Sequence, residues 1–157
     1  MPRSHDGDVL ALPLTGEWVQ APTGNSADGL VATPDGRALT RCRQTALSAG
    51  QLYNVSLKTG YVTTIALTGA EEVVNGDGLG FRMGHTLYVV QNRMNLVSVW
   101  DLDAKAATAT PRTTITDPRF DVPANAARYG NHRCLVDARF TSPQTPEATF
   151  DAVAVSI

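Results

Sequence analysis

Two stretches of the chain decide the fold: Ala27-Asp28-Gly29-Leu30 and Gly76-Asp77-Gly78-Leu79. Asp28 and Asp77 are 49 residues apart, and short apolar runs separated by turn residues follow each copy. A self-similarity of that length is typical of stacked supersecondary units, and the blades of a β-propeller are among the best candidates. Because repeated units direct equivalent residues to one place, the repeat predicts two carboxylates near a common centre.

The composition is that of one globular domain and argues against several classes of function. The chain has 157 residues, of which 43% are hydrophobic and 18% charged, so it can bury a core. The net charge is −2 and no basic block occurs, so we expect no nucleic-acid partner. No run approaches the ~20 apolar residues of a membrane span, and the polar start lacks the apolar centre of a signal peptide. We therefore expect a cytoplasmic protein without membrane contact, or a secreted one if the chain is a fragment of a longer precursor.

Short strand-like runs separated by turn residues fill the chain, and helical periodicity is almost absent. The first two expected strands, Asp8–Leu14 and Glu17–Ala21, are joined by a turn at Thr15-Gly16. The others are Leu30–Thr33, Ala38–Arg43, Leu52–Leu57, Tyr61–Leu67, Gly78–Met83, Thr86–Asn92, Leu96–Leu102, Thr108–Ile115, Val122–Arg128, Arg133–Ala138 and Thr149–Ile157. Four strands in about 40 to 50 residues match a propeller blade.

The expected fold is therefore all-β, a partial β-propeller of about three four-stranded blades in a single domain over residues 1–157. An incomplete blade at 1–24 precedes blades at 25–73 and 74–119, and an incomplete blade at 120–157 follows. In the third unit, Asp121–Asn125 stands where the earlier units carry Asp-Gly.

A second repeat runs through the same units. The segment Gly84–Arg93 aligns with Asn131–Arg139, and Arg93 and Arg139 are 46 residues apart. In this alignment Gln91, Asn92 and Asp137 end inner strands at matching positions. There they could line a pocket or satisfy backbone groups at the strand ends.

The segment Ala27–Gly36, which ends in Pro34-Asp35-Gly36, resembles the senescence marker protein/gluconolactonase family of six-bladed propellers, also called regucalcin-like. The typical segment there is Asn-Gly-Ile/Leu, a few small or apolar residues and Pro-Asp-Gly. A later Asp-Gly of the family is matched by Gly76–Leu79, and its Leu-Tyr-Val strand by Thr86–Val90. The resemblance covers roughly residues 8–140 and only the C-terminal half of that fold.

The resemblance implies a divalent cation, for instance calcium, zinc or manganese, on the propeller axis. In the family a first-blade glutamate, the asparagine of Asn-Gly and the aspartate of Asp-Gly hold the ion, which polarises a sugar-lactone carbonyl and activates water. By position, Asp28 and Asp77 are the expected metal ligands, with Asp77 at the catalytic centre. The remaining expected residues, Asn125, Gln91 and Asp137, would bind the substrate. Nothing in the chain corresponds to the first-blade glutamate.

Two functions remain open from the sequence. One is metal-dependent hydrolysis of a small-molecule substrate, a sugar-type lactone or a related ester. The other is a non-catalytic scaffold or binding module, in which the Asp-Gly pairs of Asp28 and Asp77 only make turns. Half a ring leaves open blade edges and an exposed apolar wall, so we expect two copies to pair edge to edge as a homodimer.

Overall fold

The computed structural model describes residues 11–17, 28–43, 50–70, 73–82, 84–143 and 145–157, with residues 42 and 43 described in their backbone alone. Within these ranges the regular structure is β-strand, apart from one 3-10 turn. There the chain has no helix that is long and apolar enough to cross a membrane. The prediction of an all-β, partial propeller is confirmed.

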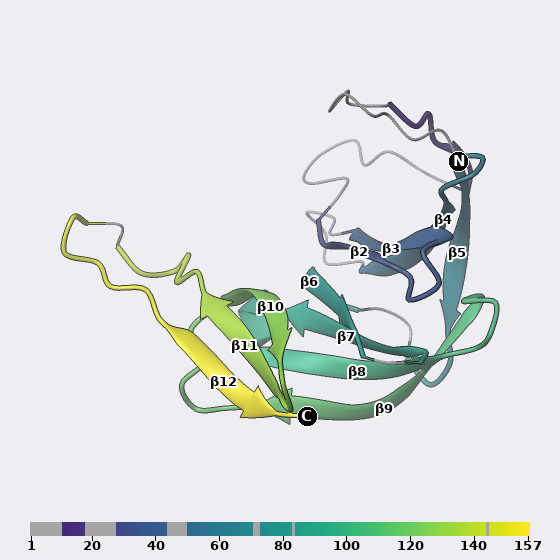
Figure 1. Ribbon diagram of the computed structural model, residues 1–157. Coiled ribbons are helices and arrows are strands. Elements are labelled where there is room, and N and C mark those ends of the chain that lie inside the picture. The colour runs from purple at the N-terminus through teal and green to yellow at the C-terminus, as the bar shows by residue number, and fades with distance from the viewer. Residues whose placement is uncertain (1–10, 18–27, 44–49, 71–72, 83, 144) are drawn as a thin grey trace.

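The strands form three antiparallel units in chain order (Figure 1). The first unit contains β2 (Leu30–Ala32), β3 (Ala38–Arg43), β4 (Gln51–Ser56) and β5 (Tyr61–Leu67). The second contains β6 (Gly76–Phe81), β7 (Thr86–Gln91), β8 (Leu96–Leu102) and β9 (Thr108–Thr116). The third contains β10 (Pro123–Tyr129), β11 (His132–Asp137) and β12 (Ala152–Ser156).

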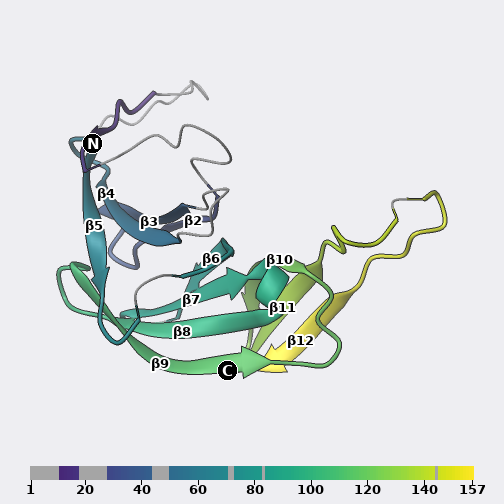
Figure 2. The same cartoon turned by 180° about the vertical axis from the view of Figure 1, so that it is seen from behind.

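The units are arranged around an open arc. The first strand of each unit, β2, β6 or β10, lies on the concave side, and β5 and β9 run along the outside (Figures 1 and 2). The outer strands β5 and β9 also pair in parallel, with Ala66 opposite Thr108 and Leu67 opposite Ala109. The first and second units are therefore joined at the periphery by backbone hydrogen bonds.

Each interface between units holds an apolar core, and β7 contributes to both. Leu87 and Val89 pack with the first unit, whereas Tyr88 and Val90 pack with the third. Successive side chains of a strand point to opposite faces, so a strand buried on both faces reads as a continuous apolar run. This explains the sequence Leu87–Val90, in which every side chain is buried.

The prediction of a turn at Thr15-Gly16 between two strands is wrong for the described residues. These two residues form β1 (Thr15–Gly16), which lies parallel to the start of β5. Residues 11–14 have no regular structure, and 8–10 and 18–21 lie outside the described residues. The reason is the open edge of β5: the backbone N–H groups of Thr15 and Glu17 donate to Gly60 O and Val62 O at 3.1 and 2.9 Å.

Candidate metal centre

Two of the inner strands start with the same irregularity. Gly76 opposes Gln91 and Leu79 opposes Val89, so Asp77 and Gly78 together oppose a single residue. The same shift occurs in β10, where Pro123 opposes Asp137 and Asn125 opposes Val136. A bulge of this kind re-aims the side chains of the extra residues. By this register Asp77 corresponds to Ala124, and Gly78 corresponds to Asn125.

The glycine after each aspartate is required by close packing of the inner strands. A Cβ atom on Gly29 would lie 1.8 Å from the carbonyl oxygen of Asp77. One on Gly78 would lie 2.6 Å from the Cα atom of Asn125. The inner strands of neighbouring units therefore meet backbone to backbone, and this contact brings Asp28, Asp77 and Asn125 to the same end of the three inner strands.

Asp77 lies in an environment that disfavours its negative charge. Burial raises the pKa of Asp77, a hydrogen bond from Asn92 partly offsets this rise, and the negative charge of Asp28 raises the pKa further. The Asn92 Nδ2 atom donates to Asp77 Oδ2 at 3.0 Å. The structure thus brings together the two carboxylates that the sequence predicts as metal ligands.

Asn92 holds Asp77 in place. It begins the 3-10 turn η1 (Asn92–Met94) and is buried. Its Oδ1 atom accepts the backbone N–H of Arg93 at 2.7 Å, which leaves the amide nitrogen directed at Asp77. The sequence predicts Asn92 at the end of a strand but does not mark it as a site residue. A usable signal was present, because Asp77 and Asn92 of the second unit are both replaced by alanine, Ala124 and Ala138, in the third.

These residues fit a divalent cation through their oxygen chemistry. A cation would neutralise two adjacent carboxylates, one of which is partly desolvated, and carboxylate and amide oxygens suit hard ions. Among the described residues, no three His, Cys, Asp or Glu side chains lie close enough to hold a metal ion together. Within the described part of the chain, further ligands would therefore be amide or carbonyl oxygens, together with water.

Asp28 also borders a hollow on the face of the first unit that is turned away from the second unit. The cavity measures about 340 Å³. Asp28 and Arg41 are its polar lining residues, and the others are Leu12, Leu14, Leu30, Leu39 and Val55. A small molecule with an apolar body could therefore lie next to Asp28.

The three predicted substrate-binding residues are placed differently. Asn125 is exposed and contacts the Gly78 backbone, and its Oδ1 atom accepts the N–H of Ala126 at 2.8 Å. Gln91 is half-buried, and its Nε2 atom donates to the carbonyl of Val74 at 2.7 Å, so its amide ties a strand end to the preceding loop.

Asp137 belongs to a different charge cluster. It is 1% exposed, and its Oδ1 atom has no hydrogen-bond partner. Burial raises the pKa of Asp137, a backbone hydrogen bond involving Asp121 lowers it, and the charges of Asp121 and Asp151 raise it again. Arg139, which lies nearby, pairs with Asp121 at 2.8 Å. Within the described part of the chain, neither Asp28 nor Asp77 is among the charged neighbours of Asp137.

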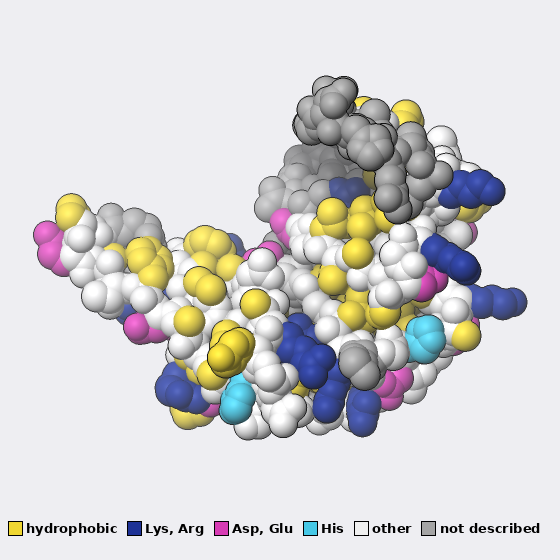
Figure 3. All heavy atoms as spheres, in the orientation of Figure 1, with side chains coloured by type: hydrophobic (Ala, Val, Ile, Leu, Met, Phe, Trp, Pro, Cys, Tyr) yellow, Lys and Arg dark blue, Asp and Glu magenta, His cyan; other side chains and the backbone are white. Residues whose placement is uncertain are grey.

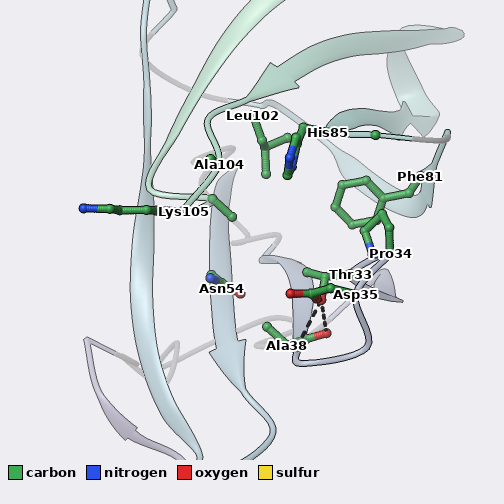
Figure 4. Close-up of a pocket in the computed structure, with 12 residues that line it drawn as sticks. Thr33, Pro34, Asp35, Ala38, Asn54, Phe81, His85, Leu102, Ala104 and Lys105 are labelled. Carbon is green, nitrogen blue, oxygen red and sulfur yellow. Dashed lines mark hydrogen bonds between the residues drawn. The ribbon is translucent and has the colours of Figure 1, made fainter.

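A second cavity, of about 220 Å³, opens at the opposite ends of the inner strands (Figure 4). It is walled by Pro34, Phe81, Leu102 and Ala104, with His85 and Lys105 at its border. Thr33 Oγ1 donates to Asp35 Oδ1 at 2.6 Å, and this bond lowers the pKa of Asp35. Because Asp35 is thus held within its own turn, this cavity offers mainly apolar contacts.

No protein-family model matches this chain, and no curated protein matches it either. The paired carboxylates of Asp28 and Asp77 are therefore the feature of the chain that bears on its function.

Proposed function

We propose that the chain is a lactonase-like propeller protein that binds a divalent cation through Asp28 and Asp77. The observation that supports this proposal is the position of Asp77, which is half-buried, is held by Asn92 and lies beside the charge of Asp28, so that its pKa is raised. A bound cation would relieve both costs. Calcium, zinc and manganese are the candidate ions, since all three accept carboxylate oxygens.

The surrounding residues have separate roles in this proposal. Asn92 fixes the orientation of Asp77, and Asp28 lies just before the neighbouring inner strand β2. Asn125 presents an exposed amide beside Gly78, where it can bind a small-molecule substrate. When bound, the cation would polarise the carbonyl of a sugar-type lactone or a related ester.

Thermal melting in the presence of each ion tests cation binding. A ligand that binds the folded state alone stabilises it by about 2.7 kcal/mol at a hundredfold excess over Kd, so calcium, manganese or zinc should raise the melting temperature. Asp77→Asn should abolish this rise. Asp117→Asn is the matched control, because Asp117 pairs with Arg119 at the surface. If no ion shifts the melting temperature of the native chain, the cation site is refuted.

Hydrolysis is tested separately, with sugar lactones and simple esters in the presence of the ion that raises the melting temperature. Activity should require the ion and should be lost in Asp77→Asn. Asn125→Ala should mainly raise KM, since Asn125 is assigned to substrate. Cation binding without hydrolysis of any such compound would contradict the enzymatic part of the proposal.

A scaffold or binding module is the second candidate. It is favoured by the close contact at Gly29 and Gly78, which gives the Asp-Gly repeat a packing role that needs no metal. This candidate predicts a chain whose stability does not depend on calcium, manganese or zinc.

A further inference from the structure

The short strand β1 pairs with the outer strand of the first unit in the same way as β5 pairs with the outer strand of the second unit. The N–H groups of Ala66 and Thr68 donate to Ala107 O and Ala109 O, both at 2.9 Å, around the start of β9. The N–H groups of Thr15 and Glu17 donate in the same alternation to Gly60 O and Val62 O around the start of β5. Both pairings are parallel. The pairing of β1 with β5 is therefore equivalent to the pairing of the end of one outer strand with the next outer strand.

The sequence before β1 fits an outer strand. The outer strands β5 and β9 share the run Thr-Thr-Ile, at 63–65 and at 113–115. Aligning Thr15 with Ala66 places Leu14 at the isoleucine and Pro13 at the second threonine, Thr64. The N–H of Thr64 points away from β4 and donates to Glu17 Oε2 at 2.6 Å. Proline lacks this N–H, so Pro13 would lose no hydrogen bond to a neighbouring third strand.

The third unit has an outer edge that this strand would fit. In the described residues β12 pairs with β11 alone. The carbonyl oxygen of Asp151 and the N–H of Ile157 both form hydrogen bonds on the β11 side of β12. Because alternate residues of a strand bond to opposite sides, the backbone groups of Ala152, Ala154 and Ser156 point to the open side. Arg119 reaches this edge with one long contact, from its NH2 atom to Ala154 O at 3.5 Å.

The free face of the third sheet also has the character of a covered surface. Its alternating positions carry no Lys, Arg, Asp or Glu within β10, β11 and β12. Val136 is 52% and Tyr129 is 80% exposed, and hydrophobic side chains show over this sheet in Figure 3. An antiparallel sheet that faces water normally has polar residues on that side. The other end of the arc is similar, because Leu30 is 58% exposed beside the leucine-lined hollow.

We infer that two copies pair head to tail, and that residues 11–17 of each copy form the outer strand of the third unit of the other. The register follows from the two complete units, in which Ile65 opposes Leu52 and Ile115 opposes Val97. Leu52 and Val97 correspond to Ala152 in the third strand. Leu14 of one copy therefore opposes Ala152 of its partner, and Leu12 opposes Ala154.

One strand then serves both copies, since alternate residues bond in opposite directions. Thr15 and Glu17 bond to their own β5, while Leu12 and Leu14 bond to the partner's β12 and displace Arg119 from its edge. The same contact made twice gives a closed ring of six units. In the third unit Asn125 stands where the second unit has Gly78. At the junction between the two copies the inner strands are therefore farther apart, and the contact is made by the outer strands. This pairing does not depend on cation binding.

Sedimentation equilibrium of the full chain tests the pairing. The native chain should have twice its mass of 16.7 kDa at micromolar concentrations. Ala154→Pro removes an N–H that faces the open side and should raise the dimer Kd by about tenfold or more. Thr114→Pro is the matched control: it lies on the edge of β9 at the position corresponding to Pro13, outside the proposed contact, and should remain dimeric. A native chain that stays monomeric at about 100 μM would overturn the inference. This holds both if another protein covers the open edge of β12 and if no protein covers it.

Cysteine cross-linking tests the register without relying on a proline. In a Cys42→Ser, Cys134→Ser background, Leu12→Cys combined with Ala154→Cys should give a covalent dimer on mild oxidation, because opposed strand residues are within disulfide range. Each single variant should give little covalent dimer. A dimer that the double variant does not cross-link, and that Ala154→Pro does not weaken, would show that the copies meet through another surface.

Discussion

Asp137 is buried, and one of its carboxylate oxygens makes no hydrogen bond. The negative charge of Asp137 therefore destabilises the folded state. Burial raises its pKa above the ordinary value of 3.8. A carboxyl that holds its proton more tightly in the folded state reduces stability as pH rises from 3.8 through the raised pKa. We expect Asp137→Asn to raise the free energy of unfolding at pH 7 by about 1 kcal/mol and to flatten this pH dependence. Urea melts between pH 4 and pH 8 measure both effects.

Asp117 provides a control of opposite sign. Arg119 holds the pKa of Asp117 at about 2, against an ordinary value of 3.8. Its stabilising contribution is present above the unfolded pKa and is lost as pH falls toward about 2. Asp117→Asn should therefore lower stability slightly at pH 7, because Arg119 is exposed and water screens its attraction to Asp117. A loss of stability in Asp137→Asn at pH 7 would contradict the assignment for Asp137.

Gly76 and Gly78 lie in the same strand but differ in the room around them. A Cβ atom on Gly78 would overlap the Asn125 backbone at 2.6 Å, whereas one on Gly76 would meet its nearest atom at 3.3 Å. Gly78→Ala should cost about 2 to 3 kcal/mol of unfolding free energy through overpacking, and Gly76→Ala less than about 1 kcal/mol. Chemical denaturation of the two variants measures the difference. Equal costs would mean that the inner strands can separate freely.

At the scale of elements, Arg133 joins three strands. From β11 it lies over the ring of Tyr88, 4.1 Å from its centroid, and its NH2 atom donates to Phe81 O at 2.8 Å. It is 2% exposed, and burial lowers its pKa. Its guanidinium also fills the space above Gly80. Arg133 thus packs one unit against the next, largely through its volume.

Arg133 variants separate packing from charge. We expect Arg133→Ala to cost about 2 to 4 kcal/mol of unfolding free energy, since it leaves a cavity and an unpaired carbonyl. Arg133→Met keeps most of the volume and removes a buried charge, so it should cost less than half as much. Denaturant titration of both variants gives the comparison. Similar losses in the two variants would show that the charge, through Tyr88 and Phe81, is the larger contribution.

Much of the fold could be predicted from the sequence because each unit is local. Apolar runs between turn residues predict β5 and β8 at their observed bounds. β1 was not predictable in this way, since Thr15 and Gly16 pair with residues more than 40 positions away and have no pattern of their own. For the site, the repeat predicted that Asp28 and Asp77 come together. It could not show the packing of Gly29 or the bond from Asn92, which depend on the distance between units.

At the scale of the molecule, residues 11–17 connect the stability of one copy to its association. Deletion of residues 1–17 would expose the edge of β5 and remove the strand offered to β12. We expect the shortened chain to lose dimerisation and to aggregate at lower concentration than the native chain, because an unprotected edge pairs with other strands. Light scattering against concentration measures both. A shortened chain that remains a dimer would contradict the role assigned to this segment.

The backbone contacts at Gly29 and Gly78 also determine how sharply the chain curves. Neighbouring units touch without intervening side chains at the inner radius, while full side-chain layers separate them farther out. Each unit is consequently wedge-shaped, and the taper fixes how many units complete a circle. Bulkier residues at both glycines would reduce the taper, so that a larger number of units would be needed to close. The smallest side chains in the protein thereby limit the circumference of any ring it can build.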